Sequence, residues 1–195
     1  ILGKILRLTF EGKPVEQNPF RQDDDLTRGQ NYVFAKGFRN PFGLWVEHGE
    51  VFVADNGPHI DRFLRVEGGG NYLWDGTDDS FNLRSEVLLV PNHGVVQMDR
   101  YPRDSNVLPE AFANMFFLTV PGNIARDPAP ENRQPPTVLT IEYDLNNSAL
   151  QGPAKEFLRF NGDYSQLLVG LAFGKDGLYF APFDEDPTGT SGIYR

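Results

Sequence analysis

The chain of 195 residues contains no cysteine, so disulfide bonds are excluded, although this leaves its redox compartment open. Basic residues are few: 18 Lys and Arg stand against 27 Asp and Glu, and the net charge is -9. The Lys and Arg residues are scattered singly, so no basic face forms and nucleic acid is excluded as a partner. No apolar run reaches the roughly 20 residues that a membrane span needs.

Turn formers and aromatic residues are abundant. The chain has 20 Gly, 15 Pro, 16 Phe and 7 Tyr, which favours short strands joined by tight turns. No segment shows a convincing helical period, and only Leu108–Asn114, where Pro109 can open a helix, suggests a helical turn. The predicted strands are Lys4–Phe10, Tyr32–Lys36, Phe42–Val46, Glu50–Ala54, Arg62–Val66, Glu86–Val90, Val95–Met98, Met115–Val120, Thr137–Tyr143, Lys155–Phe160, Leu168–Phe173, Gly177–Pro182 and Gly192–Arg195.

A weak internal repeat indicates how these strands are grouped. Residues 43–66 and 170–195 each begin with Gly-Leu in an apolar strand, turn at His48-Gly49 or Asp176-Gly177, and continue into a strand that ends in Asp. Positive φ at both central residues of such a turn favours a hairpin. Repeated hairpins of this kind predict an all-β fold, a β-propeller, with a β-sandwich as the simpler alternative.

At about 40–60 residues per blade, residues 1–195 are predicted to form one partial propeller domain of about three to four blades. A partial ring leaves strand edges unpaired, which is a liability. The chain also starts and stops in predicted strands. We therefore expect a longer protein whose N-terminal half, or another subunit, completes the ring.

Two segments carry residues suited to chemistry. Arg39 and Asn40 precede Pro41, which forces an extended entry into the next strand, where side chains can reach a central site. An ordinary surface turn is the alternative. Gly57 and Pro58 follow an apolar strand, and such a turn can aim carbonyl oxygens at a hard cation such as calcium, although most Gly-Pro turns bind nothing.

Other segments suggest less. Residues 68–74, Gly-Gly-Gly-Asn-Tyr-Leu-Trp, are no dinucleotide fingerprint, and Tyr72 and Trp74 are expected to anchor the loop. The acidic run 75–79 lacks EF-hand spacing and favours a solvated turn. Asn146 begins a glycosylation acceptor pattern that is common by chance, and no hydrolase elbow, zinc-protease motif or phosphate-cradling loop is present.

Taken in order, GFRNPFGLWV, VFVADNGP and DRFLRVEGGGNYLW resemble the soluble quinone-dependent glucose/sorbosone dehydrogenases, in particular their sorbosone-type branch. The resemblance implies a six-bladed propeller that holds pyrroloquinoline quinone (PQQ) and calcium. It assigns Arg39 and Asn40 to the quinone and the carbonyl groups of Gly57 and Pro58 to the calcium. It also places Asp184, at the end of a strand in the last blade, near the cofactor.

The implied activity is oxidation of a sugar or related alcohol or aldehyde, with an external electron acceptor, in the periplasm or outside the cell. Several positions depart from the family pattern. The family's histidine base is not in this chain, and His48, His59 and His93 lack its context, although His59 could approach the site. Departures at Asn123, Ser165 and Gln166, and in residues 61–65, keep open the alternative of a binding or scaffold propeller that has lost its cofactor.

Overall fold

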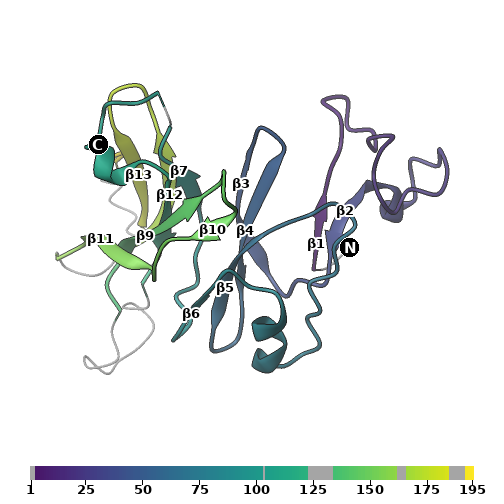
Figure 1. Ribbon diagram of the computed structural model, residues 1–195, viewed down its shortest axis with the longest axis horizontal. Helices are drawn as coiled ribbons and strands as arrows, with labels where there is room; N and C mark the ends of the chain where they lie inside the picture. The colour runs from purple at the N-terminus through teal and green to yellow at the C-terminus, as the bar shows by residue number, and fades with distance from the viewer. Residues whose placement is uncertain (1–2, 103, 123–133, 162–165, 185–191) are drawn as a thin grey trace. The chain divides into compact units, whose positions relative to one another are not determined.

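The computed structural model describes residues 3–102, 104–122, 134–161, 166–184 and 192–195, and at Gln166 and Asp184 it describes the backbone alone. The predicted all-β class is confirmed, since the only helices in these ranges are three short 3-10 segments (Figure 1). The strands are β1 (Lys4–Leu6), β2 (Val33–Lys36), β3 (Pro41–Glu47), β4 (Glu50–Asn56), β5 (Asp61–Arg65), β6 (Val87–Leu89), β7 (Met98–Arg100), β8 (Met115–Val120), β9 (Thr137–Asp144), β10 (Ala149–Leu150), β11 (Lys155–Arg159), β12 (Gln166–Phe173) and β13 (Leu178–Asp184).

The chain divides into two compact units. The first contains residues 1–42 and 46–92, and the second contains residues 43–45 and 93–195. Each unit has its own hydrophobic core, because each brings the apolar faces of different antiparallel sheets together.

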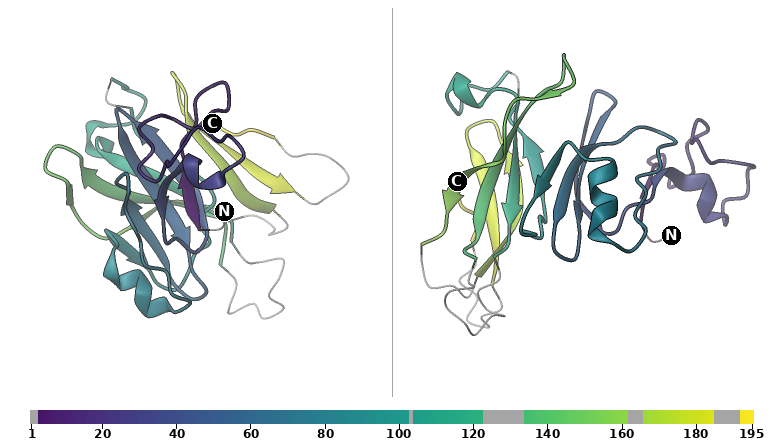
Figure 2. Two further views of the ribbon diagram at one scale, coloured as in Figure 1. Left: turned by 90° about the vertical axis from the view of Figure 1, so that its right-hand side faces the viewer. Right: turned by 60° about the horizontal axis from the view of Figure 1, so that its bottom comes forward.

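The first unit contains the two-stranded sheet β1-β2 and most of the four-stranded sheet β3-β4-β5-β6. Strand β4 is almost wholly apolar up to Asp55 and is buried along most of its length. The core residues of this unit are Ala35, Phe38, Val51, Val53, Leu64, Val66 and Tyr72. The 3-10 helix η2 (Asp78–Leu83) lies beside the sheet (Figure 2), with the Phe81 ring 5.1 Å from that of Trp74.

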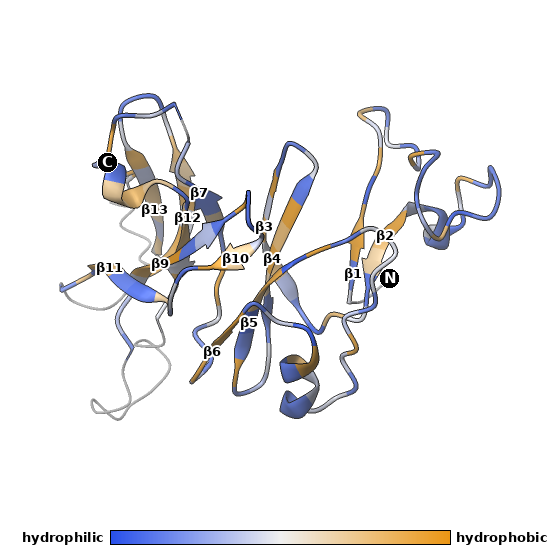
Figure 3. Cartoon of the chain, in the orientation of Figure 1, coloured by the Kyte–Doolittle hydropathy of each residue, from blue (hydrophilic) through white to orange (hydrophobic). Residues whose placement is uncertain are grey.

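The second unit contains the sheet β7-β8-β9, in which β9 also pairs with β10 and β11, and the separate pair β12-β13. Strand β8 is apolar along most of its length, and Phe117 at its centre is fully buried. The core residues of this unit are Tyr101, Phe117, Val138, Leu168, Leu171 and Leu178. In Figure 3 many strands are hydrophobic in colour, whereas the loop between β1 and β2 is mostly hydrophilic.

The two predicted hairpin turns have different geometries. His48 and Gly49 both have positive φ, 51° and 85°, which confirms the turn expected between β3 and β4. The turn between β12 and β13 also exists, but neither Asp176 nor Gly177 has positive φ. There the connection is longer, and the amide of Gly174 donates to the carbonyl oxygen of Gly177 at 2.9 Å, so the tighter geometry expected at Asp176-Gly177 is wrong.

Three other expectations need correction. The strand expected at Val95–Met98 begins only at Met98, and the pairing before it is irregular. The amides of Val96 and Gln97 donate to the carbonyl and hydroxyl oxygens of Thr119, whose own amide donates to the Gln97 carbonyl oxygen. Residues 192–195 contribute an isolated bridge between Tyr194 and Phe180 rather than a strand. The helical turn expected at Leu108–Asn114 is shorter, a 3-10 helix η3 (Glu110–Phe112) that Pro109 precedes. The sequence does not predict β10, η2 or the 3-10 helix η1 (Gly29–Tyr32).

Replacing Phe117 with alanine tests the second core. The Phe117 ring makes edge contacts with the rings of Phe157 and Phe173, each 5.0 Å away. We expect Phe117→Ala to lower the free energy of unfolding by about 3–5 kcal/mol, because it removes packing and leaves a cavity. Urea unfolding followed by circular dichroism measures this change. Phe10→Ala is the control, since Phe10 is fully exposed, and a loss as large there would contradict the assignment of the core.

Candidate functional site

The loop that leads into β3 is held by a carboxylate on β4. The amide of Asn40 donates to Asp55 Oδ1 at 2.7 Å, and the amide of Arg39 donates to both oxygens of the same carboxylate, at 3.1 and 3.2 Å. Asp55 is fully buried. Its carboxylate therefore satisfies two loop amides and fixes the backbone from which the Arg39 and Asn40 side chains project.

Arg62 on β5 neutralises that carboxylate. It lies directly opposite Asp55 in the strand pair and bonds Asp55 Oδ2 through Nε at 3.0 Å and Nη2 at 2.9 Å, with both side chains fully buried. Burial lowers the pKa of the Arg62 guanidinium, and the charge of Asp55 opposes that shift. This pairing makes the buried arginine tolerable, since two of its N–H donors bond one carboxylate oxygen of opposite charge.

The remaining donors of Arg62 join the pair to two other segments. Nη1 donates to the carbonyl oxygen of Tyr72 at 2.8 Å, and Nη2 to that of Gly37 at 3.2 Å. The guanidinium also lies over the Phe81 ring, 4.4 Å from its centre. One buried side chain thus connects the loop before β3, the glycine-rich loop and η2.

The Gly57-Pro58 turn is shaped by close packing. The amide of Gly57 donates to the buried Asp61 carboxylate at 3.0 Å. A Cβ at Gly57 would lie 2.1 Å from the carbonyl oxygen of Ile60 and 2.6 Å from the Phe81 ring, so only glycine fits here. In the described part of the chain, the carbonyl oxygens of Gly57 and Pro58 accept no hydrogen bond; Gly57 is buried and Pro58 is exposed.

The structure brings four of the five predicted site residues together. Arg39 Nη1 donates to the carbonyl oxygen of Asn56 at 2.9 Å, and the amide of Asn56 donates to the carbonyl oxygen of Asn40 at 3.0 Å. Since Asn56 directly precedes Gly57, the exposed Arg39 and Asn40 side chains lie beside the Gly57-Pro58 turn. This cluster provides a cation, an amide and two carbonyl oxygens, a set suited to an anionic ligand with a bound metal.

Asp184 is the fifth predicted residue and lies in the second unit. Its backbone ends β13 and pairs with Gln166 of β12, and its side chain is outside the described part. Three positions depart from the family pattern in this region. Asn123 and Ser165 lie outside the described part of the chain, and Gln166 is described only by its backbone.

The three histidines have different surroundings. His59 directly follows the Gly57-Pro58 turn, and its Nδ1 lies 2.8 Å from the carboxylate of Asp78. His48 is exposed in its hairpin turn, as expected, and His93 is half-buried. The acidic run 75–79 forms a turn. Asp75 accepts hydrogen bonds from the amide and the hydroxyl of Thr77, and these bonds lower the pKa of the Asp75 carboxyl.

The glycine-rich loop behaves as expected. Tyr72 is buried, its ring stacks on that of Phe38 with centres 4.7 Å apart, and its hydroxyl accepts the amide of Glu67. Burial raises the pKa of the Tyr72 hydroxyl. Trp74 is half-buried, and its ring is tilted by 57° against that of Phe81, so both aromatic residues anchor the loop through contacts with other rings.

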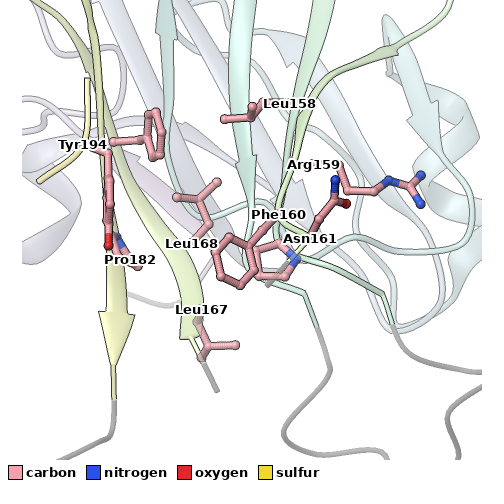
Figure 4. Close-up of a pocket in the computed structure, with 10 residues that line it drawn as sticks. Leu158, Arg159, Phe160, Asn161, Leu167, Leu168, Pro182 and Tyr194 are labelled. Carbon is pink, nitrogen blue, oxygen red and sulfur yellow. The ribbon is translucent and has the colours of Figure 1, made fainter. Parts of the chain in front are cut away.

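An apolar pocket of about 330 Å³ lies in the second unit between β11, β12 and β13 (Figure 4). Leu158, Phe160 and Leu168 are among the side chains that line it, and Arg159 points away from it and bonds the Glu156 carboxylate. Among the described residues that line this pocket there is no carboxylate and no histidine.

Comparison with solved structures shows that the all-β fold of this chain matches about half of the fold of six-bladed β-propeller sugar dehydrogenases. A glucose dehydrogenase aligns with a TM-score of 0.69 and 21% identity, over 93% of this chain and 51% of that one. The apo-form of the soluble aldose sugar dehydrogenase from Escherichia coli aligns with a TM-score of 0.66 and 20% identity, over 98% and 53%. An oxidoreductase described as a glucose dehydrogenase, from Thermus thermophilus, aligns with a TM-score of 0.64 and 22% identity, over 98% of this chain and 51% of that one.

In sequence, residues 1–91 match the family model described as Glucose / Sorbosone dehydrogenase. The resemblance to that family and the propeller fold are thereby confirmed, and the chain spans about half the length of the solved chains it matches. Comparison with curated proteins gives no match. No helix in the described residues is long and apolar enough to cross a membrane.

Sequence reasoning did not assign Asp55 and Arg62 to the site. The sequence predicts Arg62 only as the start of a strand, among residues that depart from the family pattern, and Asp55 only as the acidic residue that ends the strand of the repeat. A charged residue within each of two neighbouring apolar strands is a usable signal, because a buried charge needs an opposite charge close by. The two residues satisfy that need across the strand pair.

Removing one partner of this pair tests its role. Arg62→Leu leaves the Asp55 carboxylate buried without its partner, and we expect a loss of about 3–5 kcal/mol in the free energy of unfolding. The matched control is Arg65→Leu on the same strand, which removes a partly exposed pair with Glu50 and costs at most about 1 kcal/mol. Urea unfolding measures both, and equal losses would contradict a special role for Arg62.

Proposed function

We propose that this chain supplies one wall of the cofactor site of a PQQ- and calcium-dependent dehydrogenase that oxidises a sugar or related alcohol or aldehyde. The observation that carries the proposal is the cluster of Arg39, Asn40 and the Gly57-Pro58 turn, held by the Asp55–Arg62 pair. The match of residues 1–91 to the dehydrogenase family supports it.

The residues present fit one side of such a site. Calcium takes about six to eight oxygen ligands, and the Gly57 and Pro58 carbonyl groups provide two that accept no bond from the described residues. No group of three or more acidic or imidazole side chains gathers in the described part, so the remaining ligands would come from the quinone, water or other residues.

The chain's own residues would bind and orient the cofactor. Arg39 uses one N–H donor on the Asn56 carbonyl group and can direct others to a quinone oxygen or carboxylate. The Asn40 side chain is exposed beside it. When bound, the quinone and calcium supply the hydride acceptor and the charge that stabilises it. The base that takes the substrate's hydroxyl proton would come from outside this chain, as would the external electron acceptor.

The rest of the ring is part of the proposal. On β3, which is an edge strand of its sheet, Phe42, Leu44 and Val46 are 56%, 43% and 60% exposed. A run of exposed apolar side chains along an edge strand is a surface that soluble proteins cover. We therefore assign the covering element to the other half of a propeller, or to another subunit. From the family resemblance alone, we also propose a location in the periplasm or outside the cell.

Arg39→Ala tests the site assignment. If Arg39 makes a charged hydrogen bond to the quinone, the substitution weakens quinone binding by about 1.5–3 kcal/mol. Equilibrium dialysis of the full-length protein against PQQ, with calcium and with EDTA, measures the affinity, and binding should require calcium. Arg28→Ala, which removes an exposed arginine paired with Asp23, should leave the affinity unchanged.

Two outcomes would count against the proposal. Unchanged affinity in Arg39→Ala would remove Arg39 from the site. If the full-length protein, with the completed ring, retains no quinone absorbance after gel filtration with calcium, and reduces no dye with a panel of sugars, the dehydrogenase proposal fails and the scaffold alternative stands.

A further inference from the structure

A histidine–carboxylate pair lies directly beside the Gly57-Pro58 turn. His59 follows Pro58 in the chain, and its Nδ1 lies 2.8 Å from a carboxylate oxygen of Asp78, the first residue of η2. The His59 side chain is 82% exposed, and no described residue bonds its Nε2. One ring nitrogen is thus engaged by the protein, and the other is open to a ligand.

Neighbouring contacts fix the position of this pair. The Phe81 ring of η2 lies against the Arg62 guanidinium and fills the space that a Cβ at Gly57 would need, so η2 is packed against the turn. The carbonyl oxygen of His59 accepts the amide of Asn92 at 2.7 Å, which holds the histidine backbone. The imidazole is therefore held at its backbone and at Nδ1, although it is open to solvent.

Asp78 holds the histidine at a cost to the fold. Its Oδ2 is paired with His59, whereas its Oδ1 is buried and has no hydrogen-bond partner. A buried oxygen without a partner destabilises the folded state, and a role in a functional site is one of the reasons for which proteins keep such a group. In the described part of the chain, the bond to His59 is the only one that the Asp78 side chain makes.

This bond determines which hydrogen-bonding group His59 presents. A carboxylate only accepts, so Nδ1 donates to it, and in the neutral imidazole Nε2 is then an acceptor. Arg39, which bonds the carbonyl oxygen of Asn56, carries only donors, and these suit the oxygen atoms of a quinone or a carboxylate. An acceptor such as Nε2 suits a hydroxyl group instead. His59 is therefore matched to a hydroxylated substrate and not to the quinone.

We propose that His59 Nε2 accepts a hydrogen bond from a hydroxyl group of the substrate, and that Asp78 is a positioning residue that holds the imidazole in this tautomer. The inference rests on the proposed dehydrogenase function, in which the base for the oxidised hydroxyl comes from outside this chain. The hydroxyl that contacts His59 is therefore a different one, so the contact favours sugars over alcohols with a single hydroxyl group. Because His59 is joined directly to the Pro58 carbonyl group, a substrate beside calcium at that carbonyl lies within reach of the imidazole.

Steady-state kinetics of the full-length protein, loaded with PQQ and calcium, test the role of His59. His59→Ala should raise KM for the sugar about threefold to tenfold, the equivalent of one net hydrogen bond, and leave kcat nearly unchanged. His59→Gln keeps an acceptor oxygen near the position of Nε2 and should restore most of the loss. His48→Ala, at an exposed histidine in a hairpin turn, is the control and should leave KM unchanged.

A measurement without the quinone and without turnover tests the role of Asp78. Nitrogen NMR shifts of the imidazole in the full-length protein should show the proton on Nδ1 of His59, and His59→Ala identifies the signals. Asp78→Ala should remove this tautomer preference, because it removes the acceptor of the Nδ1 proton. Asp79→Ala, at the exposed neighbouring residue, is the matched control and should leave the shifts unchanged.

The outcomes separate this inference from the dehydrogenase proposal. If the unaltered full-length protein retains no quinone and reduces no dye, both fail. If it reduces dye but His59→Ala leaves KM unchanged, or weakens PQQ binding as much as Arg39→Ala does, only the substrate contact of His59 is overturned. Imidazole shifts that are the same in Asp78→Ala as in the unaltered protein would overturn the positioning role of Asp78.

Discussion

The buried ion pair between Asp55 and Arg62 is the interaction on which the first unit's candidate site depends. Two charges without solvent contact are costly unless their hydrogen bonds are satisfied, and here the surrounding backbone satisfies them. The carboxylate accepts the amides of Arg39 and Asn40, and the guanidinium donates to the carbonyl groups of Gly37 and Tyr72. Segments with little regular structure of their own are thereby fixed relative to β4 and β5, and the exposed Arg39 and Asn40 side chains gain a rigid base.

This arrangement explains why a departure from the family pattern need not abolish the site. Arg62 lies within residues 61–65, which depart from the family pattern, yet its side chain is buried and bonds the loop that carries Arg39. The Gly57-Pro58 turn is fixed separately, by Asp61 and by the tight fit of Gly57 against Ile60 and Phe81. Within one short stretch of sequence, buried residues thus hold the backbone, and the exposed Arg39 and Asn40 belong to the candidate site.

Much of the fold could be predicted from the sequence, because alternation and turn chemistry act locally. Strand β8 occupies the predicted residues, and the His48-Gly49 turn has the expected positive φ. The errors lie at irregular pairings and turns. Before β7 begins, residues 96 and 97 bond Thr119 irregularly, and residues 174–177 form a longer turn than expected. In the candidate site, the exposed residues followed from motifs, whereas the Asp55–Arg62 pair required the strand register.

Native-state hydrogen exchange of the Arg39 and Asn40 backbone amides tests most directly whether the buried pair organises the site. Both amides belong to an exposed loop outside the strands, and their only described acceptor is the Asp55 carboxylate. If the account is right, they exchange as slowly as the amides of β4 and β5, because the loop opens only when the pair is broken. Exchange at the rate of exposed turn amides such as those of residues 75–79 would contradict it.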